Sequence, residues 1–316
     1  MNDLINKIIC DDCIEFLSKH KERFADLIFA DPPFNIGYKY DKYHDKHKRE
    51  NYIEWTRKWI TACKNVLKPT GSFYIAIGDT YAANIKIIAD ELGLSMRNWI
   101  IWYYTFGQQT KTKFARAHTH IFYFVNNPKE FTFNDHAVRV PSQRQLTYND
   151  RRANSTGKIP DDVWNTFPRV CGTFKERAGW HPCQMPETLL KRIIAVSSNP
   201  GDLVLDPFSG SGTTPAAAYQ FGRKYLALEI SETYVENARQ RLAELGKQCP
   251  KQNLLFKKTE FDELKRLLSD TGKTPKQVTT DPSLLAIVTS QLAVRMNNAK
   301  KYQVAEVAAA LRDFAG

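Results

Sequence analysis

The stretch LVLDPFSGSGTT, residues 203–214, decides the fold class of this sequence. It begins as an apolar strand that ends in Asp206, continues as a tight turn with Gly210 and Gly212, and then opens a helix. Glycines let the backbone approach a ligand, and the free amides of a helix N-terminus suit an anionic group. The stretch therefore predicts a strand, a ligand-binding turn and a helix, the unit from which α/β folds are built.

The residues around this turn limit the class of ligand. A phosphate-binding P-loop needs a Lys directly before a Ser or Thr at the helix start, and the stretch has none. The dinucleotide fingerprint also fails, because its third glycine is missing. The next apolar run ends in Glu229, 23 residues after Asp206, and an acid at about that spacing can bind ribose hydroxyls. The pattern favours a turn that binds an adenosine-type cofactor without a diphosphate. The alternative is a structural turn that only connects the strand to the helix.

Apolar runs and amphipathic stretches alternate along the first 245 residues. Seven runs resemble strands: 6–10, 25–30, 71–77, 98–104, 120–125, 202–206 and 224–230. Five stretches resemble helices: 51–66, 81–92, 186–197, 213–220 and 231–245. The alternation predicts a Rossmann-like, doubly wound, seven-stranded and mostly parallel sheet. Since no helix separates 98–104 from 120–125, we expect an antiparallel hairpin at the sheet edge.

Composition and charge restrict the partners. The chain has 316 residues, 42% of them hydrophobic, so it can bury a sizeable core without disulfides or metals. Its formal net charge of +11 indicates a polyanionic partner, with nucleic acid ahead of an anionic membrane surface. No apolar run approaches the roughly 20 residues of a membrane-spanning helix, and the first residues lack a signal-peptide layout. We therefore expect a cytoplasmic protein with no membrane partner.

The six cysteines are scattered along the chain and do not form a disulfide framework. Cys10 and Cys13 have the C-x-x-C spacing, but a zinc site needs a second pair of ligands, and the nearest is His181 with Cys183. We expect reduced cysteines and no metal site.

A second motif follows the apolar run that ends at Ala30. Asp31, Pro32, Pro33 and Phe34 stop the strand abruptly, because consecutive prolines cannot continue a sheet ladder. In a doubly wound sheet, the carboxyl ends of the strands are where ligands bind. The Asp31 carboxylate and the Pro32 carbonyl could accept two hydrogen bonds from an exocyclic amine, while Phe34 stacks on its ring. The alternative is a strand-ending turn with an incidental aspartate.

Two regions depart from the α/β alternation. Residues 126–180 are irregular and rich in Arg, Asn, Thr and Pro, with isolated aromatic residues that argue against disorder. We interpret them as a module that contacts a partner, with a decorated surface loop as the alternative. After residue 246, three helix-like segments at 261–270, 283–296 and 303–314 predict a small helical extension.

The DPPF tetrad and the DPFSGSGTT stretch together resemble the amino-group DNA methyltransferases that use S-adenosylmethionine. The catalytic motif precedes the cofactor motif, which is the permuted order of the β group. Further segments match in the same order: CDDCIEFL at 10–17, NVLKPTGSFYIAIGD at 65–79 and HPCQMPETLLKRIIAVSSNPGDLVLD at 181–206. The resemblance covers roughly residues 6–245 and implies a methyltransferase catalytic domain over 1–245, followed by a helical extension over 246–316.

The resemblance also implies roles for particular residues. The catalytic residues would be Asp31, Pro32, Pro33 and Phe34. The cofactor-binding residues would be Asp12, Cys13, Asp206, Phe208, Ser209, Gly210, Gly212, Thr213 and Glu229. The target recognition region would be inserted at about 108–180, where we expect DNA contacts from Arg139, Arg144, Arg151, Arg152, Lys158 and Arg169.

Several alternatives follow from the same motifs. The tetrad beginning with Asp favours adenine N6 over the cytosine 4-amino group, since family members that act on cytosine usually begin it with Ser. Cys183 lies in a Pro-Cys-Gln triplet like that of cytosine carbon-5 methyltransferases, but it precedes the glycine turn instead of following it. A DNA-binding protein without catalysis is a further alternative.

The resemblance also extends to partners and context. It implies duplex DNA as a partner in a prokaryotic or phage-like setting, and it leaves room for a homodimer and a cognate restriction endonuclease. We expect the charged stretch from Tyr38 to Tyr52 to form a loop over the DNA or the cofactor, with a solvated loop as the alternative.

Overall fold

The computed structural model describes residues 2–108, 110–148, 150, 152–172, 174–247 and 256–314. It divides the chain into two compact units. Unit 1 consists of Met1–Phe133 and Asp162–Lys247, and unit 2 consists of Asn134–Asp161 and Gln248–Gly316. None of the described helices is long and apolar enough to cross a membrane.

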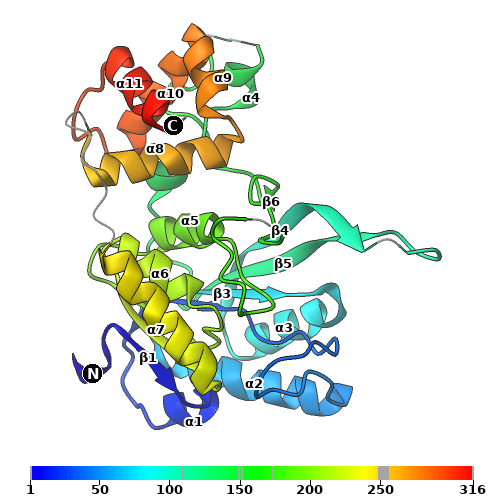
Figure 1. Ribbon diagram of the computed structural model, residues 1–316. Coiled ribbons are helices and arrows are strands. Elements are labelled where there is room, and N and C mark those ends of the chain that lie inside the picture. Colours follow the sequence, from blue (N-terminus) through cyan, green and yellow to red (C-terminus); the bar gives the residue numbers. More distant parts are fainter. Residues whose placement is uncertain are drawn as a thin grey trace. The chain divides into compact units, whose positions relative to one another are not determined.

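Unit 1 contains a mixed sheet with the order β1-β8-β7-β2-β3-β5-β4-β6 (Figure 1). Its strands are β1 (Lys7–Cys10), β2 (Ala25–Ala30), β3 (Leu67–Ile77), β4 (Ser95–Gln108), β5 (Arg116–Val125), β6 (Val163–Trp164), β7 (Leu203–Asp206) and β8 (Lys224–Glu229). All seven predicted strands are present, and the short β6 makes an eighth at the edge beside β4. The pairs of β5 with β3 and with β4 are antiparallel, as expected for the hairpin, and the other pairs are parallel. The prediction of a doubly wound α/β fold is confirmed.

Helices cover both faces of this sheet. They are α1 (Cys13–Ser18), α2 (Arg49–Val66), α3 (Asp79–Glu91), α5 (Glu187–Ser197), α6 (Thr213–Gln220) and α7 (Glu232–Lys247), preceded by a 3-10 turn at Asn2–Leu4. Side chains of successive strand residues point to opposite faces. On β2, Ile28 and Ala30 belong to the core with α1, α2 and α3, whereas Leu27 and Phe29 belong to the core with α5, α6 and α7. Leu27 to Ala30 are all apolar because both faces of the strand are buried there.

The chain leaves β2 and β7 in opposite directions. These two strands pair in parallel, with Ile28 opposite Leu205. From β2 the chain passes through α2 to β3 on one side, and from β7 it passes through α6 to β8 on the other. A crevice therefore opens at the carboxyl ends of β2 and β7, where the strand order reverses. Asp31 and Asp206 lie at these two strand ends.

Unit 2 is built from helices and a short irregular segment. It contains the 3-10 turn η2 (Asp135–Val138), α4 (Gln143–Leu146), α8 (Lys258–Thr271), α9 (Pro275–Thr280), α10 (Pro282–Arg295) and α11 (Val304–Asp313). The predicted helical segments correspond to α8, α10 and α11. The additional α9 begins after Thr274, whose side chain caps it. The helices enclose a core of their own, against which Leu146 packs.

Hydrogen bonds from α10 connect the two stretches of unit 2, and one of them comes from a buried arginine. Arg295 on α10 is 4% exposed and pairs with Asp270 at 2.7 Å and with Glu263 at 3.2 Å. Its Nε donates to the Arg139 carbonyl at 2.8 Å. The Gln291 side chain also donates to a backbone carbonyl of residues 134–161, at 3.2 Å. The units thus differ from the predicted boundaries, because 134–161 groups with the C-terminal helices and not with the sheet.

Candidate active site

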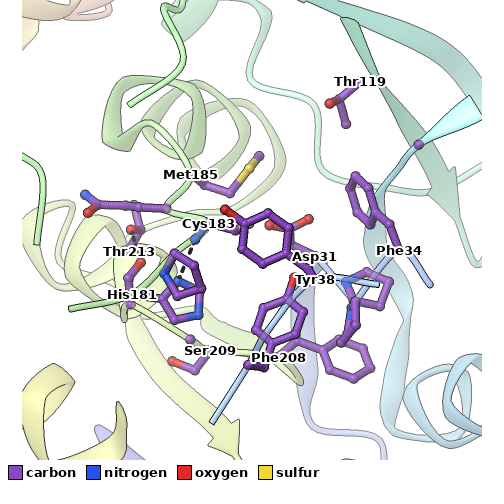
Figure 2. Close-up of a pocket in the computed structure, with 18 of the residues that line it drawn as sticks. Asp31, Phe34, Tyr38, Thr119, His181, Cys183, Met185, Phe208, Ser209 and Thr213 are labelled. Carbon is purple, nitrogen blue, oxygen red and sulfur yellow. Dashed lines mark hydrogen bonds between the residues drawn. The ribbon is translucent and has the colours of Figure 1, made fainter. Parts of the chain in front are cut away.

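A cavity of about 830 Å³ opens in unit 1 at the carboxyl ends of the parallel strands. This volume lies near the upper end of the range for ligand-binding sites. The cavity is lined by most of the residues predicted for catalysis and cofactor binding: Asp12, Cys13, Asp31, Pro32, Pro33, Phe34, Asp206, Phe208, Ser209, Gly210, Thr213 and Glu229. Figure 2 shows several of these side chains gathered around Asp31. The predicted residues thus come together from four strand ends that are far apart in the sequence.

A tyrosine of α2 stabilises the double-proline corner through a hydrogen bond. The Tyr52 hydroxyl donates to the Pro33 carbonyl at 2.6 Å, and Tyr52 is almost fully buried. The Phe34 ring lies against Gly78, where a Cβ atom would be 3.2 Å from Cδ2 of the ring. The corner is therefore fixed between a buried hydroxyl and a glycine, and it holds the Asp31 carboxyl at the cavity wall.

Asp31 and Asp206 are two of the acidic side chains that line this cavity. The pKa of Asp31 is raised to about 7, mainly by burial and also by the neighbouring Asp206, while Arg169 opposes the shift. Burial likewise raises the pKa of Asp206 to about 7, against hydrogen bonds from Thr214 and from the Phe208 amide, the latter at 2.9 Å. Both carboxyl groups thus change charge near neutral pH, in a place where a cationic or amine ligand would favour their ionised forms.

The glycine turn is braced by Glu229. One carboxylate oxygen of Glu229 accepts from the Gly210 amide at 2.9 Å, and the other accepts from the Ser231 amide at 3.0 Å. Gly210 has φ +47°, and a Cβ atom there would be 2.7 Å from Nε2 of His181. Gly212 has φ +72° and packs on Ala238 instead of lining the cavity. Gly212 therefore shapes the turn but is not among the residues that face the cavity.

The polar and aromatic side chains of the cavity fit a nucleoside better than a phosphate. The Ser209 hydroxyl is buried, lines the cavity and has no hydrogen-bond partner among the described residues. The carboxyl groups of Asp12 and Glu229 face the same space and would repel an anion. Phe208 and Trp55 add aromatic surface, with ring centroids 5.7 Å apart. These groups can accept from hydroxyls and amines and can pack against a flat ring, as S-adenosylmethionine requires.

Asp12 and Cys13 begin α1 beside the cavity. One Asp12 oxygen caps the helix by accepting from the amides of Ile14 at 2.8 Å and Glu15 at 3.0 Å. Cys13 is buried, and burial raises the pKa of its thiol, so it contributes apolar surface. Among the described residues, no cluster of acids, histidines and cysteines is arranged to hold a metal ion.

The charged loop after Phe34 is organised by one buried aspartate. Asp45 is 2% exposed, and its carboxylate accepts from the amides of Asn35 at 2.7 Å, Ile36 at 3.1 Å and Tyr38 at 2.9 Å. Five side chains of this loop line the cavity: Ile36, Tyr38, Tyr40, Lys42 and Tyr43. The part of the Tyr38–Tyr52 stretch before α2 is thus a loop with a defined structure at the cavity, and the later part belongs to α2.

His181 and Cys183 are site residues that sequence reasoning did not select. The Cys183 amide donates to Nδ1 of His181 at 3.3 Å, so a neutral His181 carries its proton on Nε2, which faces Gly210. Burial lowers the pKa of His181 to about 4, which keeps the ring neutral. Burial and the nearby Asp31 raise the pKa of Cys183, which argues against a thiolate nucleophile. Both residues lie in the HPCQMPETLL segment, and the resemblance of this segment to the methyltransferase family was the signal that could have identified them.

The residues predicted to bind DNA are divided between the units. Arg169 lines the cavity in unit 1, with its guanidinium 5.7 Å from the centre of the Tyr104 ring. Four others belong to unit 2 and form ion pairs there: Arg139 with Asp135, Arg144 and Arg152 with Asp150, and Lys158 with Asp161. Arg151 lies outside the described residues.

Comparison with known proteins gives matches to one family. The family described as DNA methylase matches residues 25–240. The chain is 38% identical to the Type II methyltransferase M.HpaI of Haemophilus parainfluenzae over 237 residues, which is 75% of this chain and 74% of that protein. It is 40% identical to the DNA adenine methyltransferase YhdJ of Escherichia coli (strain K12) over 245 residues, which is 74% of this chain and 82% of that protein.

Solved structures share the fold. The M1.HpyAVI-SAM complex matches with a TM-score of 0.53 and 22% identity, over 75% of this chain and 98% of that chain. The cytosine-N4-specific PvuII DNA methyltransferase matches with a TM-score of 0.59 and 19% identity, over 84% of this chain and 93% of that chain.

Proposed function

Because this chain belongs to the DNA methylase family, we propose that it is a site-specific DNA methyltransferase that acts on the 6-amino group of adenine in duplex DNA. The methyl donor is S-adenosylmethionine. The observation that carries this proposal is the meeting of the DPPF corner and the glycine turn in one cavity, at the point where the strand order reverses. Such a cavity holds a donor and an acceptor side by side, which direct transfer between them requires.

The cofactor-binding part of the cavity is formed by the ends of β1, β7 and β8. Glu229 accepts from ribose hydroxyls with the lone pairs that the Gly210 and Ser231 amides leave open. The Ser209 hydroxyl finds in the ligand the hydrogen-bond partner that the described residues do not provide. When bound, S-adenosylmethionine supplies a methyl group on a positively charged sulfur, and the acids of the site favour that charge.

The DPPF corner binds and positions the target base. An adenine inside the duplex cannot reach the cavity, so it must be flipped out at a cost of a few kcal/mol. Stacking on Phe34 offsets on the order of 1–3 kcal/mol of this cost. The Asp31 carboxylate and the Pro32 carbonyl accept the two N–H bonds of the amine, which localises the lone pair of its nitrogen. The amine nitrogen then attacks the transferred methyl group directly. Catalysis is therefore mainly positioning and electrostatic complementarity.

Adenine is preferred to cytosine as the target for two reasons. The tetrad begins with Asp31, and the relative YhdJ is named a DNA adenine methyltransferase. The likeness to the cytosine-specific PvuII enzyme is a likeness of fold at 19% identity and does not favour cytosine. The complete tetrad and glycine turn also argue against a DNA-binding protein without catalysis.

The experiment that tests this function uses purified protein, isotopically labelled S-adenosylmethionine and unmethylated DNA. We expect N6-methyladenine when the digested nucleosides are separated and identified by mass spectrometry. N4-methylcytosine would replace the adenine assignment by the cytosine one, and the absence of any methylated nucleoside would contradict the proposal.

The further predictions concern partners and location. A homodimer, a cognate restriction endonuclease and a cytoplasmic location in a prokaryotic or phage setting remain predictions. So do the DNA contacts from Arg139, Arg144, Arg151, Arg152, Lys158 and Arg169. The names of two relatives, Type II methyltransferases M.HpaI and M.BglII, support the idea of a restriction partner.

A further inference from the structure

The hairpin of β4 and β5 extends past the other strands of unit 1 (Figure 1). Gln108 pairs with Arg116 near its end, and the turn beyond them contains Phe114. The Phe114 side chain is 100% exposed. A large apolar side chain at the tip of a projecting hairpin has no folding role in this unit, so its position calls for a partner.

The tip of this hairpin is connected to the active site. Thr110, Lys113 and Arg116 line the cavity, so the immediate neighbour of Phe114 in the chain lies at its wall. Arg116 also pairs with Asp79 at 2.9 Å. Asp79 follows Gly78, on which the Phe34 ring packs. The residue directly before the exposed phenylalanine therefore lines the same cavity as the ring that we assign to stacking of the target base.

The charge of the hairpin fits DNA. From residue 92 to residue 129 the sequence contains no Asp and no Glu, while it contains Arg97, Lys111, Lys113, Arg116 and Lys129. Lysines on both sides of an exposed aromatic residue can bind phosphates while the ring contacts bases. Two copies of such a hairpin would repel each other, which disfavours a second copy of this chain as the partner.

We propose that Phe114 is a wedge that enters the base stack beside the target adenine and stabilises the flipped state, with Lys111 and Lys113 on the adjacent phosphates. Architectural DNA-binding proteins insert apolar side chains between base steps in this way and partly unstack them. This inference rests on the proposed function, because a wedge is needed only if a base leaves the duplex.

The test compares two DNA substrates after the modified site has been mapped by sequencing. One duplex is fully paired, and in the other the target adenine is mispaired and already weakly stacked. We expect Phe114→Ala to lower kcat/KM on the paired duplex by about 10-fold or more, as the loss of a wedge would. On the mispaired duplex the loss should be less than about 2-fold, because flipping costs least for a mismatched base. Phe114→Trp should restore most of the activity.

Two controls keep the outcomes separate. Tyr219→Ala removes another exposed aromatic side chain of unit 1, 48% exposed and outside the cavity lining, and should leave both substrates unaffected. An equal loss for Phe114→Ala on both substrates, or a change of molecular mass in light scattering, would overturn the wedge. If the wild-type protein methylates neither substrate, the proposed function fails, and the wedge is overturned with it because it depends on that function.

Discussion

Asp31 and Asp206 lie at the carboxyl ends of two neighbouring parallel strands, and the charge of Asp206 raises the pKa of Asp31. Burial brings the pKa of each to about 7, so the two acids titrate where the enzyme would work. This relationship makes the protonation state of the site part of its chemistry, and the pH dependence of activity and of stability should reveal it.

The first prediction concerns Asp31 and the pH profile of activity. The ionised carboxylate is a stronger acceptor for the amine than the protonated carboxyl group, so kcat/KM should rise with pH through about 7. Asp31→Ala should abolish turnover while cofactor binding persists. Asp31→Asn retains an acceptor oxygen that does not titrate, and it should give weak activity with no rise near pH 7. A pH profile unchanged in Asp31→Asn would contradict the assignment.

The second prediction concerns Asp206 and stability without cofactor. The folded state keeps the Asp206 proton up to about pH 7, whereas the unfolded state releases it near 3.8. Since the unfolded state binds fewer protons in this interval, stability falls as pH rises from about 4 to 7. The free energy of unfolding of Asp206→Asn should therefore increase by about 4 kcal/mol relative to the wild type between pH 4 and pH 8. Urea unfolding at several pH values measures this, and a constant difference would contradict it.

The third prediction compares two glycines that both have positive φ. Gly210→Ala places a methyl group 2.7 Å from the His181 ring, whereas Gly222→Ala meets no atom within 4 Å. Both should lose on the order of 1 kcal/mol of stability from backbone strain. Only Gly210→Ala should also raise the Kd for S-adenosylmethionine, by about 10-fold, a loss of about 1.4 kcal/mol. Calorimetric titration separates the two effects, and equal Kd values would remove the turn from the cofactor site.

The fourth prediction concerns Arg152 in unit 2. Its side chain is 84% exposed and pairs with Asp150, which places a cation at the surface of the segment that we expect to contact DNA. Arg152→Ala should weaken duplex binding and reduce the salt dependence of log K by about 0.9 if one phosphate contact is lost. Lys276→Ala, an exposed lysine on α9 of the same unit, is the matched control. An identical salt slope in all three proteins would contradict a phosphate contact.

The strand ends were predictable because each carries a local signal. Asp31, Asp206 and Glu229 each follow an apolar run, and the parallel fold brings such ends together at one edge. His181 and Tyr40 give no such signal, because they lie in irregular segments and reach the cavity through contacts that are distant in sequence. Their ring centroids are 6.3 Å apart, yet more than a hundred residues separate them in the chain.

The grouping of residues 134–161 with the C-terminal helices was also invisible in the sequence. It depends on Arg295 and the Arg139 carbonyl, a bond between a side chain and a backbone group 156 residues apart. Periodicity describes single helices and strands, and it carries no information about such a pairing.

The construction of unit 2 from two stretches constrains how residues 134–161 can be exchanged between relatives during evolution. A recombination event that replaced 134–161 alone would join a foreign segment to helices whose buried Arg295 is fitted to the native backbone. The two stretches should therefore be inherited together. Among relatives that carry both, substitutions in 134–161 should covary with substitutions on α8 and α10 more strongly than with those on the strands of unit 1.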